Sequence, residues 1–122
     1  MLTQSTALER VRSFAESIRS QHISLRKVIL FGSYARNEQR SFSDIDVALV
    51  ADEFTGFGFQ DVGLIGASLA QKLFVDIEPH TFSPEQLSDW NPFVQEIKRT
   101  GIVVGEWEPA AAGNGILGVQ YG

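Results

Sequence analysis

Two strand patterns, the first of which ends at a glycine, constrain the fold more than any other feature of this sequence. Val28–Phe31 is a run of four apolar residues that ends at Gly32, which is typical of a buried strand entering a tight turn. Asp44–Val50 alternates between apolar and other residues, so Asp44 and Asp46 project from the same face of a strand. The chain must therefore build a sheet in which one strand carries two neighbouring carboxylates.

The rest of the chain alternates between helical and strand patterns. We expect strands over Val28–Phe31, Asp44–Val50, Val75–Phe82 and Ile102–Val104. We expect helices over Ser5–Ser20, Ser33–Asn37 and Val62–Leu73, a short helix opened by the capping box Ser83–Gln86, and a helix from Asn91 to Gly101. The first helix could be capped by Thr3, Ser5 or Thr6, and Thr55–Phe59 is expected to be a loop. Because the connections are short and irregular, this order favours an α+β variant of the α/β class. We expect a mixed sheet of three to five strands flanked by helices rather than a doubly wound parallel sheet.

Composition excludes several functional classes. The 122 residues fit one domain, which we place at residues 1–104, and the Gly- and Ala-rich sequence of residues 105–122 predicts a flexible tail. Without cysteine there is no disulfide, thiolate zinc site or cysteine nucleophile. A formal net charge of −5 disfavours direct nucleic-acid binding. No apolar run is long enough for a membrane span and no signal-peptide pattern opens the chain, so we expect a cytoplasmic protein without membrane contact.

Asp44 and Asp46 form a candidate metal-binding pair. Because neighbouring carboxylates repel each other, such a pair needs either a compensating positive charge or full hydration. A divalent metal is the simplest compensator, and oxygen ligands favour Mg²⁺ or Mn²⁺. Asp76, on the third predicted strand, could supply another carboxylate, and Glu78 and His80 share its face. A lone histidine is more often a structural residue, so His80 receives no role. Two Mg²⁺ ions held by three carboxylates can clamp phosphate oxygens and activate an attacking hydroxyl.

Gly32 and Ser33 form a candidate phosphate-binding turn. Glycine allows a ligand to approach the backbone, and the first N–H groups of the short helix expected there can donate to an anion. The Ser33 hydroxyl adds a donor, and Arg36 and Arg40 are near enough in sequence to add positive charge. A phosphate-binding turn beside a carboxylate pair predicts a nucleoside-triphosphate site for phosphoryl or nucleotidyl transfer.

The order of these motifs resembles the signature of the polymerase-beta-like nucleotidyltransferase superfamily. The segment FGSYARNEQRSFSDIDVALV is similar to its minimal nucleotidyltransferase branch, and the resemblance extends over residues 28–87. The family usually has glycine after the Ala-Arg pair, where this chain has Asn37. Asparagine tolerates a positive φ better than most residues, so the turn can be preserved.

The resemblance implies a nucleotidyltransferase fold and a set of site residues. Gly32, Ser33 and Arg36 would bind the triphosphate of ATP, and Asp44 and Asp46 would ligate two Mg²⁺ ions, with Mn²⁺ as an alternative. The third catalytic and metal-binding carboxylate falls most naturally on Asp76, with Glu78 as the rival assignment.

We therefore expect an enzyme that transfers AMP from ATP to a hydroxyl acceptor. Small members of this branch bind HEPN-domain proteins, so the resemblance implies a tyrosine of a partner HEPN toxin as acceptor and an antitoxin role. Two alternatives remain open. The chain could silence such a partner by contact alone with residual nucleotide binding, or it could be a small-molecule adenylyltransferase acting as a homodimer.

Three phenylalanines in the loop before the second long helix have an ambiguous role. Phe54, Phe57 and Phe59 could plug the core, stack on a base or contact a partner, and we favour the core. Trp90 and Trp107 could pack against the sheet or mark a contact surface.

Overall fold

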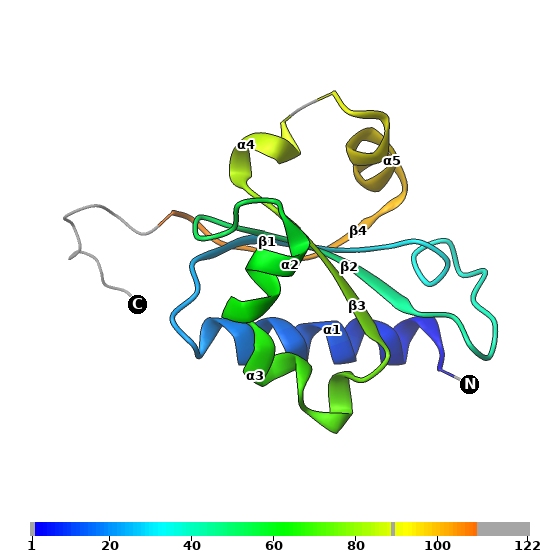
Figure 1. Cartoon of the computed structure of the whole chain (residues 1–122). Helices are drawn as coiled ribbons and strands as arrows, with labels where there is room; N and C mark the ends of the chain where they lie inside the picture. The colour runs from blue at the N-terminus through cyan, green and yellow to red at the C-terminus, as the bar shows by residue number, and fades with distance from the viewer. Residues whose placement is uncertain (1, 89, 110–122) are drawn as a thin grey trace.

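A mixed four-stranded sheet forms the centre of the protein. The computed structural model describes residues 2–88 and 90–109. The strands are β1 (Leu25–Phe31), β2 (Ile45–Ala51), β3 (Ile77–Phe82) and β4 (Ile102–Glu106), in the order β3-β2-β1-β4 (Figure 1). β1 is antiparallel to β2 and β4, whereas β2 and β3 run parallel. The predicted mixed sheet with flanking helices is confirmed.

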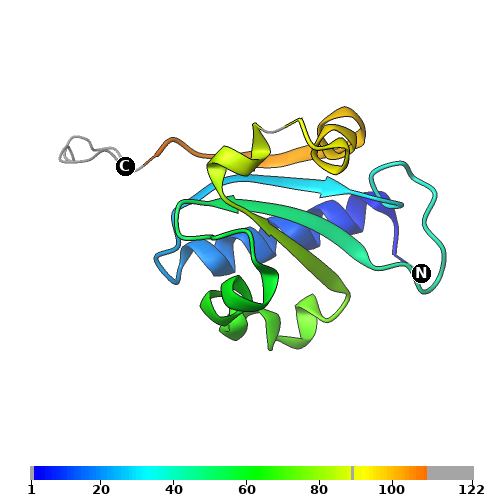
Figure 2. The same cartoon turned by 45° about the horizontal axis from the view of Figure 1, so that its top comes forward.

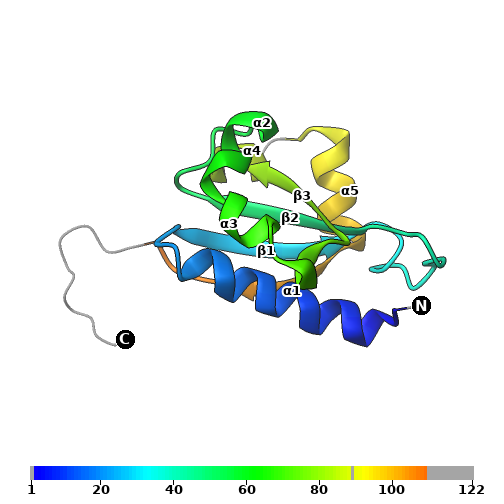
Figure 3. The same ribbon diagram turned by 60° about the horizontal axis from the view of Figure 1, so that its bottom comes forward.

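One face of the sheet is covered by the long helix α1 (Gln4–Arg19). Thr3 is its cap, because the Thr3 side chain accepts a hydrogen bond of 3.1 Å from the Thr6 N–H. Figure 3 shows α1 running across this face. The helix residues that pack against the sheet lie along one face of the helix, namely Ala7, Val11, Phe14, Ala15 and Ile18.

The crossover from β2 to β3 is not the continuous helix that the sequence predicts. It consists of α2 (Gly58–Asp61), α3 (Gly66–Leu69) and two 3₁₀ turns at residues 62–64 and 72–74. Glycines at positions 63 and 66 raise the cost of a continuous helix. Of the expected apolar stripe, only Ile65 is fully buried. A set of short turns buries this residue without ordering a long helix.

The opposite face is covered by α4 (Pro84–Leu87) and α5 (Pro92–Thr100) (Figure 2). The predicted capping box at the start of α4 is present. Asn91 caps α5 by accepting a 2.8 Å hydrogen bond from the Phe93 N–H. Ile97 of α5 packs with apolar residues of β1 and β2 on this face. The sheet is therefore sandwiched between two helical layers.

Among the described residues, none of the helices combines the length and apolar character that crossing a membrane requires.

The last strand continues beyond the expected domain end at residue 104. β4 reaches Glu106 because residues 105 and 106 still pair with β1. The Trp107 backbone N–H donates to the Arg26 carbonyl at 3.0 Å, and the Trp107 side chain packs against the main core and lies under the Arg19 guanidinium. Residues 105–107 thus belong to the folded unit, and residues 110–122 of the predicted tail lie outside the described part of the chain.

Asp61 is a buried carboxylate that holds the loop after β2. It accepts hydrogen bonds from the Thr55 N–H at 2.8 Å, the Thr55 hydroxyl at 3.1 Å, the Gly56 N–H at 2.9 Å and the Thr81 hydroxyl at 2.7 Å. Burial alone would raise the pKa of Asp61, but these four hydrogen bonds together lower it. Of the three loop phenylalanines, Phe54 is buried, whereas Phe57 and Phe59 are exposed, so the core prediction holds only for Phe54.

We predict that Asp61→Asn destabilises the protein by about 2 kcal/mol, because an amide leaves at least one buried donor without an acceptor. The lowered pKa means that this carboxylate stabilises the fold above the pKa of an unfolded aspartate. That contribution is lost as pH falls through the folded pKa. Urea unfolding at pH 7 and in steps down to pH 3 measures the difference. Asp52→Asn, at a half-exposed ion pair with Arg26, is the matched control and should cost less than about 1 kcal/mol. An equal effect of both substitutions would contradict the prediction.

Candidate active site

The turn after β1 places its backbone at Gly32 against the Asp46 side chain of β2. Gly32 has a φ of +76°, and a Cβ at this position would overlap Oδ2 of Asp46. Glycine therefore supplies both the left-handed backbone and the close approach. The segment 33–37 forms consecutive turns rather than the expected short helix, because Asn37 at φ +58° reverses the chain. The positive φ predicted as tolerable for Asn37 is the one that it adopts.

The N-terminus of α1 and the core fix this turn in place. The Gln4 side-chain amide donates to the carbonyls of Tyr34 and Ala35 at 3.0 and 3.2 Å. The Tyr34 side chain is buried in the main core. The turn is therefore anchored from both sides, while Ser33 keeps partial exposure to solvent.

Parallel pairing of β2 with β3 brings the acidic groups together. Asp46 is opposite Glu78 in the register and, on its other side, opposite Phe31 of β1. His80 Nε2 lies 3.4 Å from Oδ1 of Asp46 and 3.8 Å from Oε2 of Glu78. In the described part of the chain, one ligand atom each from Asp46, Glu78 and His80 lie within 4.8 Å of one another. We call this set the acid–histidine cluster.

The electrostatics of the cluster show crowding of negative charge. A hydrogen bond with the Asp44 side chain, burial and the charge of Asp46 raise the pKa of Glu78, while nearby His80 opposes the rise. Asp44, which directly precedes β2, is thus part of the same electrostatic group. A cation bound among these side chains would offset the remaining repulsion between their carboxylates.

The donor set fits a divalent cation. Two or three carboxylates with an imidazole match the oxygen preference of Mg²⁺ and the mixed oxygen and nitrogen preference of Mn²⁺. The Asp46 side chain is 26% exposed and the His80 side chain is 29% exposed, so their ligand atoms are positioned by the surrounding structure and are still accessible to an ion from solvent. Asp46, Glu78 and His80, with Asp44 beside them, are the residues that could hold the ion.

Two of the predicted site residues lie apart from the acid–histidine cluster. Asp76, in the turn before β3, forms a 3.6 Å ion pair with Arg10 of α1. The Asp76 carbonyl accepts from the Ile45 N–H at 2.8 Å, which aligns β2 with β3. Arg36 forms a 3.0 Å ion pair with Glu38. Among the described residues, Glu78 rather than Asp76 lies in the acid–histidine cluster with Asp46, and the assignment of Asp76 as the third metal ligand stays a prediction.

His80 is the cluster member for which the sequence analysis proposed no role. The signal was present, since His80 shares the two-residue period of Asp76 and Glu78 on one strand. Only the pairing of β3 with β2 shows that this face meets Asp46.

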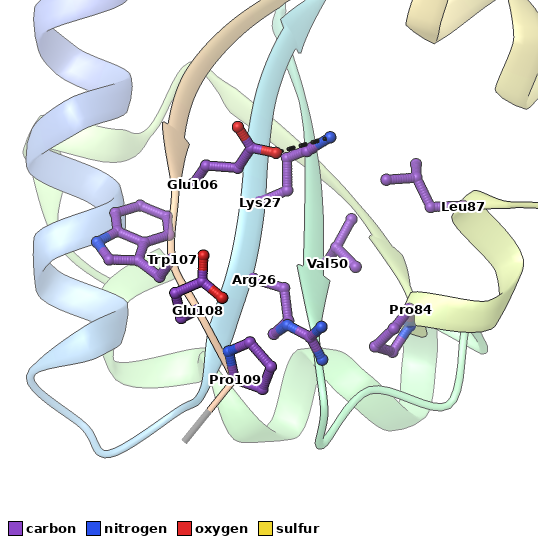
Figure 4. Close-up of a pocket in the computed structure, with 9 residues that line it drawn as sticks. All are labelled: Arg26, Lys27, Val50, Pro84, Leu87, Glu106, Trp107, Glu108 and Pro109. Atoms are coloured by element: carbon purple, nitrogen blue, oxygen red, sulfur yellow. Dashed lines mark ion pairs between the residues drawn. The ribbon is translucent and has the colours of Figure 1, made fainter. Parts of the chain in front are cut away.

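A separate cavity lies at the other end of the sheet. It has a volume of about 470 Å³ and is lined by residues of β1, α4 and the end of β4 (Figure 4). Two of its basic side chains are paired, with Lys27 at 3.1 Å from Glu106 and Arg26 at 2.8 Å from Asp52. Lys27 is four residues along β1 from Phe31, about 13 Å at the rise of a strand. This cavity is therefore remote from the acid–histidine cluster.

Comparison with known proteins places this site in a family. The family model described as "Polymerase beta, Nucleotidyltransferase" matches residues 15–107. The chain belongs to this family. The resemblance inferred from the Gly32-Ser33 and Asp44-x-Asp46 motifs is confirmed, and membership in this family implies a nucleotide substrate and a divalent metal.

Individual relatives agree with the family. A Methanocaldococcus jannaschii protein named as a candidate protein adenylyltransferase is 40% identical over 43 residues, which are 34% of this chain and 43% of that protein. The match thus spans less than half of this relative. A crystal structure of a candidate nucleotidyltransferase from Sulfolobus solfataricus has a TM-score of 0.61 at 18% identity, covering 82% of this chain and 80% of that one. A mutant of the toxin–antitoxin MntA–HpeT has a TM-score of 0.56 at 18% identity, covering 80% and 73%. These two structures show a shared fold.

We predict that Gly32→Ala weakens Mn²⁺ binding by at least about tenfold, because the new methyl group displaces Asp46. The left-handed backbone should also cost about 1–2 kcal/mol of stability. Calorimetric titration and urea unfolding measure the two effects. Gly63→Ala is the control, since a Cβ there meets no atom within 4 Å, and it should leave Mn²⁺ affinity unchanged without lowering stability. Unchanged Mn²⁺ affinity in Gly32→Ala would argue against close packing of the turn on the metal ligand.

We predict that Glu78→Gln makes the metal-free protein more stable at pH 7.5. The pKa of Glu78 is higher in the folded chain than in the unfolded chain, so Glu78 ionises less readily when the chain is folded. The stability that Glu78 contributes below its unfolded pKa is therefore lost as pH rises through its folded pKa. Glutamine does not ionise and so avoids this loss. Because the Glu78 side chain is half exposed, the gain should be only about 0.3 kcal/mol. Unfolding in chelator at pH 7.5 and pH 4 tests it, and the gain should vanish at the lower pH. A loss of stability at pH 7.5 would contradict it.

Proposed function

We propose that this nucleotidyltransferase transfers AMP from ATP to a tyrosine hydroxyl of a HEPN-domain partner. The observation that carries the proposal is the convergence of Asp46, Glu78 and His80 beside the Gly32 turn. A phosphate-binding turn against a metal-binding acid cluster suits a triphosphate whose charge must be neutralised during the reaction.

Each part of the site takes one task in this proposal. Backbone N–H groups of the turn and the Ser33 hydroxyl bind the triphosphate, and Arg36 is available to it by exchanging its surface partner Glu38. Asp44, Asp46 and Glu78 hold the divalent ions, with His80 beside them. When bound, two Mg²⁺ ions would neutralise the phosphates and lower the pKa of the attacking hydroxyl.

Asp76 is proposed to act on the acceptor side. It lines a cavity of about 350 Å³ with Leu2, Tyr34, Phe42 and two serines, one of which, Ser43, adjoins Asp44. A tyrosine hydroxyl entering there would give its proton to Asp76, and its oxygen would attack the α-phosphorus of ATP. The bond from that phosphorus to the β-phosphate oxygen breaks, and pyrophosphate leaves.

A protein acceptor is favoured by the surface around this cavity. The Phe42 side chain is 97% exposed and Val75, next to Asp76, is 74% exposed. Apolar side chains gathered at a site suit protein contact better than water. The relative named as a candidate protein adenylyltransferase and the toxin–antitoxin structure support a partner of this kind.

The test incubates the protein with ATP, Mg²⁺ and a purified candidate HEPN-domain partner. Intact mass spectrometry should show the mass of an adenylyl group added to the partner, and fragmentation should place it on a tyrosine. Asp46→Asn should abolish transfer and lower Mn²⁺ affinity. Asp76→Asn should leave Mn²⁺ affinity unchanged and slow transfer by about 10²–10⁴-fold, whereas Glu78→Gln should lower Mn²⁺ affinity.

Three outcomes would contradict parts of the proposal. If wild-type protein binds ATP but adds no mass to the partner, the assigned acceptor is wrong. If Asp46→Asn still suppresses the toxicity of the partner, silencing is by contact alone. Weaker Mn²⁺ binding in Asp76→Asn than in Glu78→Gln would return the third ligand to Asp76.

A further inference from the structure

A group of aromatic rings extends the acid–histidine cluster along the face covered by α5. Phe31 lies 5.0 Å from the His80 ring and 5.7 Å from the Phe93 ring, both edge to face. Phe93 is 6.0 Å from His80 and 6.4 Å from Phe82 between ring centroids. These separations are those of mutually packed aromatic side chains. We call Phe31, His80, Phe82 and Phe93 the aromatic group.

A small cavity opens beside this group. Its volume is about 260 Å³, below the 300–1,000 Å³ typical of pockets that enclose a whole drug-sized ligand. It is lined by Gly56, Gly58, Pro79, His80, Thr81, Phe82 and Phe93. The Phe93 side chain is 47% exposed although it packs on Phe31, so part of its surface remains free for a ligand.

The lining of the cavity is suited to a flat ring with little charge. Among its described lining residues, His80 is the one with a titratable side chain, and the Thr81 hydroxyl is already donated to Asp61. What remains are aromatic surfaces, a proline and glycine backbone. Such a site holds a ring by stacking and apolar contact rather than by side-chain hydrogen bonds.

We propose that this cavity binds the nucleobase of the nucleoside triphosphate, with Phe93 as the stacking residue. The inference rests on the proposed function, because the phosphates are assigned to the adjoining turn and metal site. His80 connects the two regions, since it contacts Asp46 on one side and belongs to the aromatic group on the other. A base tethered to phosphates at Asp46 would reach this neighbouring cavity. Stacking without side-chain hydrogen bonds also implies weak discrimination between bases.

The position of Phe93 is set by features independent of any ligand. Asn91 caps α5 through the Phe93 N–H, and the next helix residue, Val94, is buried. Leucine at position 93 would keep the apolar packing on Phe31 and the helix, but it would remove the aromatic ring. Phe93→Leu is therefore the variant that separates stacking from folding.

The test compares two ligands in the presence of Mn²⁺ by calorimetry: ATP, and ribose 5-triphosphate, which lacks a base. Phe93→Leu should weaken ATP binding by about 5- to 100-fold and leave ribose 5-triphosphate binding unchanged. Phe93→Trp should restore ATP affinity. Phe59→Leu is the matched control, since it makes the same change at a phenylalanine that is 84% exposed and does not line this cavity.

The outcomes separate this inference from the proposed function. ATP affinity of Phe93→Leu equal to that of the wild type would overturn the nucleobase site, and so would equal weakening of both ligands. A raised KM for the protein acceptor with unchanged ATP affinity would assign the cavity to the acceptor and also overturn it. If wild-type protein binds neither ligand, the proposed function fails and the inference fails with it.

Discussion

In-register parallel pairing of β2 with β3 is the constraint on which the site depends. The pairing sets Asp46 opposite Glu78, and a shift of one residue would turn one of the two carboxylates to the other face. Apolar residues fix the register, because Ile45 and Ile77 pack into the core on the α1 side. The buried face of the sheet thus determines which polar groups meet on the opposite face.

The fold accepts an unfavourable arrangement at this point. Crowded acid groups raise the pKa of Glu78, which means that the folded chain holds its charge less readily than an unfolded one. The core under α1 and the anchored turn at Gly32 supply the stability that keeps these groups together. Such local cost is typical of functional sites, and the proposed divalent cation would offset it.

Local patterns predicted those elements of the fold whose residues carry their own signal. The helix that Thr3 caps, the capping box at Ser83 and the cap at Asn91 were read from short-range spacing, because caps and amphipathic faces are local. The short helices and turns between β2 and β3 are not predicted by local patterns, because apolar spacing alone cannot show that Ile65 is buried while Val62 and Leu73 are exposed. The extra length of β4 likewise depends on a partner strand, β1, that is distant in sequence.

The sequence by itself determined the chemistry of the site: a glycine turn at Gly32, two carboxylates on one strand face at Asp44 and Asp46, and the family that this order indicates. The tertiary structure decided which other groups join them. Glu78 and His80 meet Asp46, whereas Asp76 pairs with Arg10. The physical reason is that side-chain alternation is a property of one strand, while the neighbour of a side chain depends on register between strands far apart in the chain.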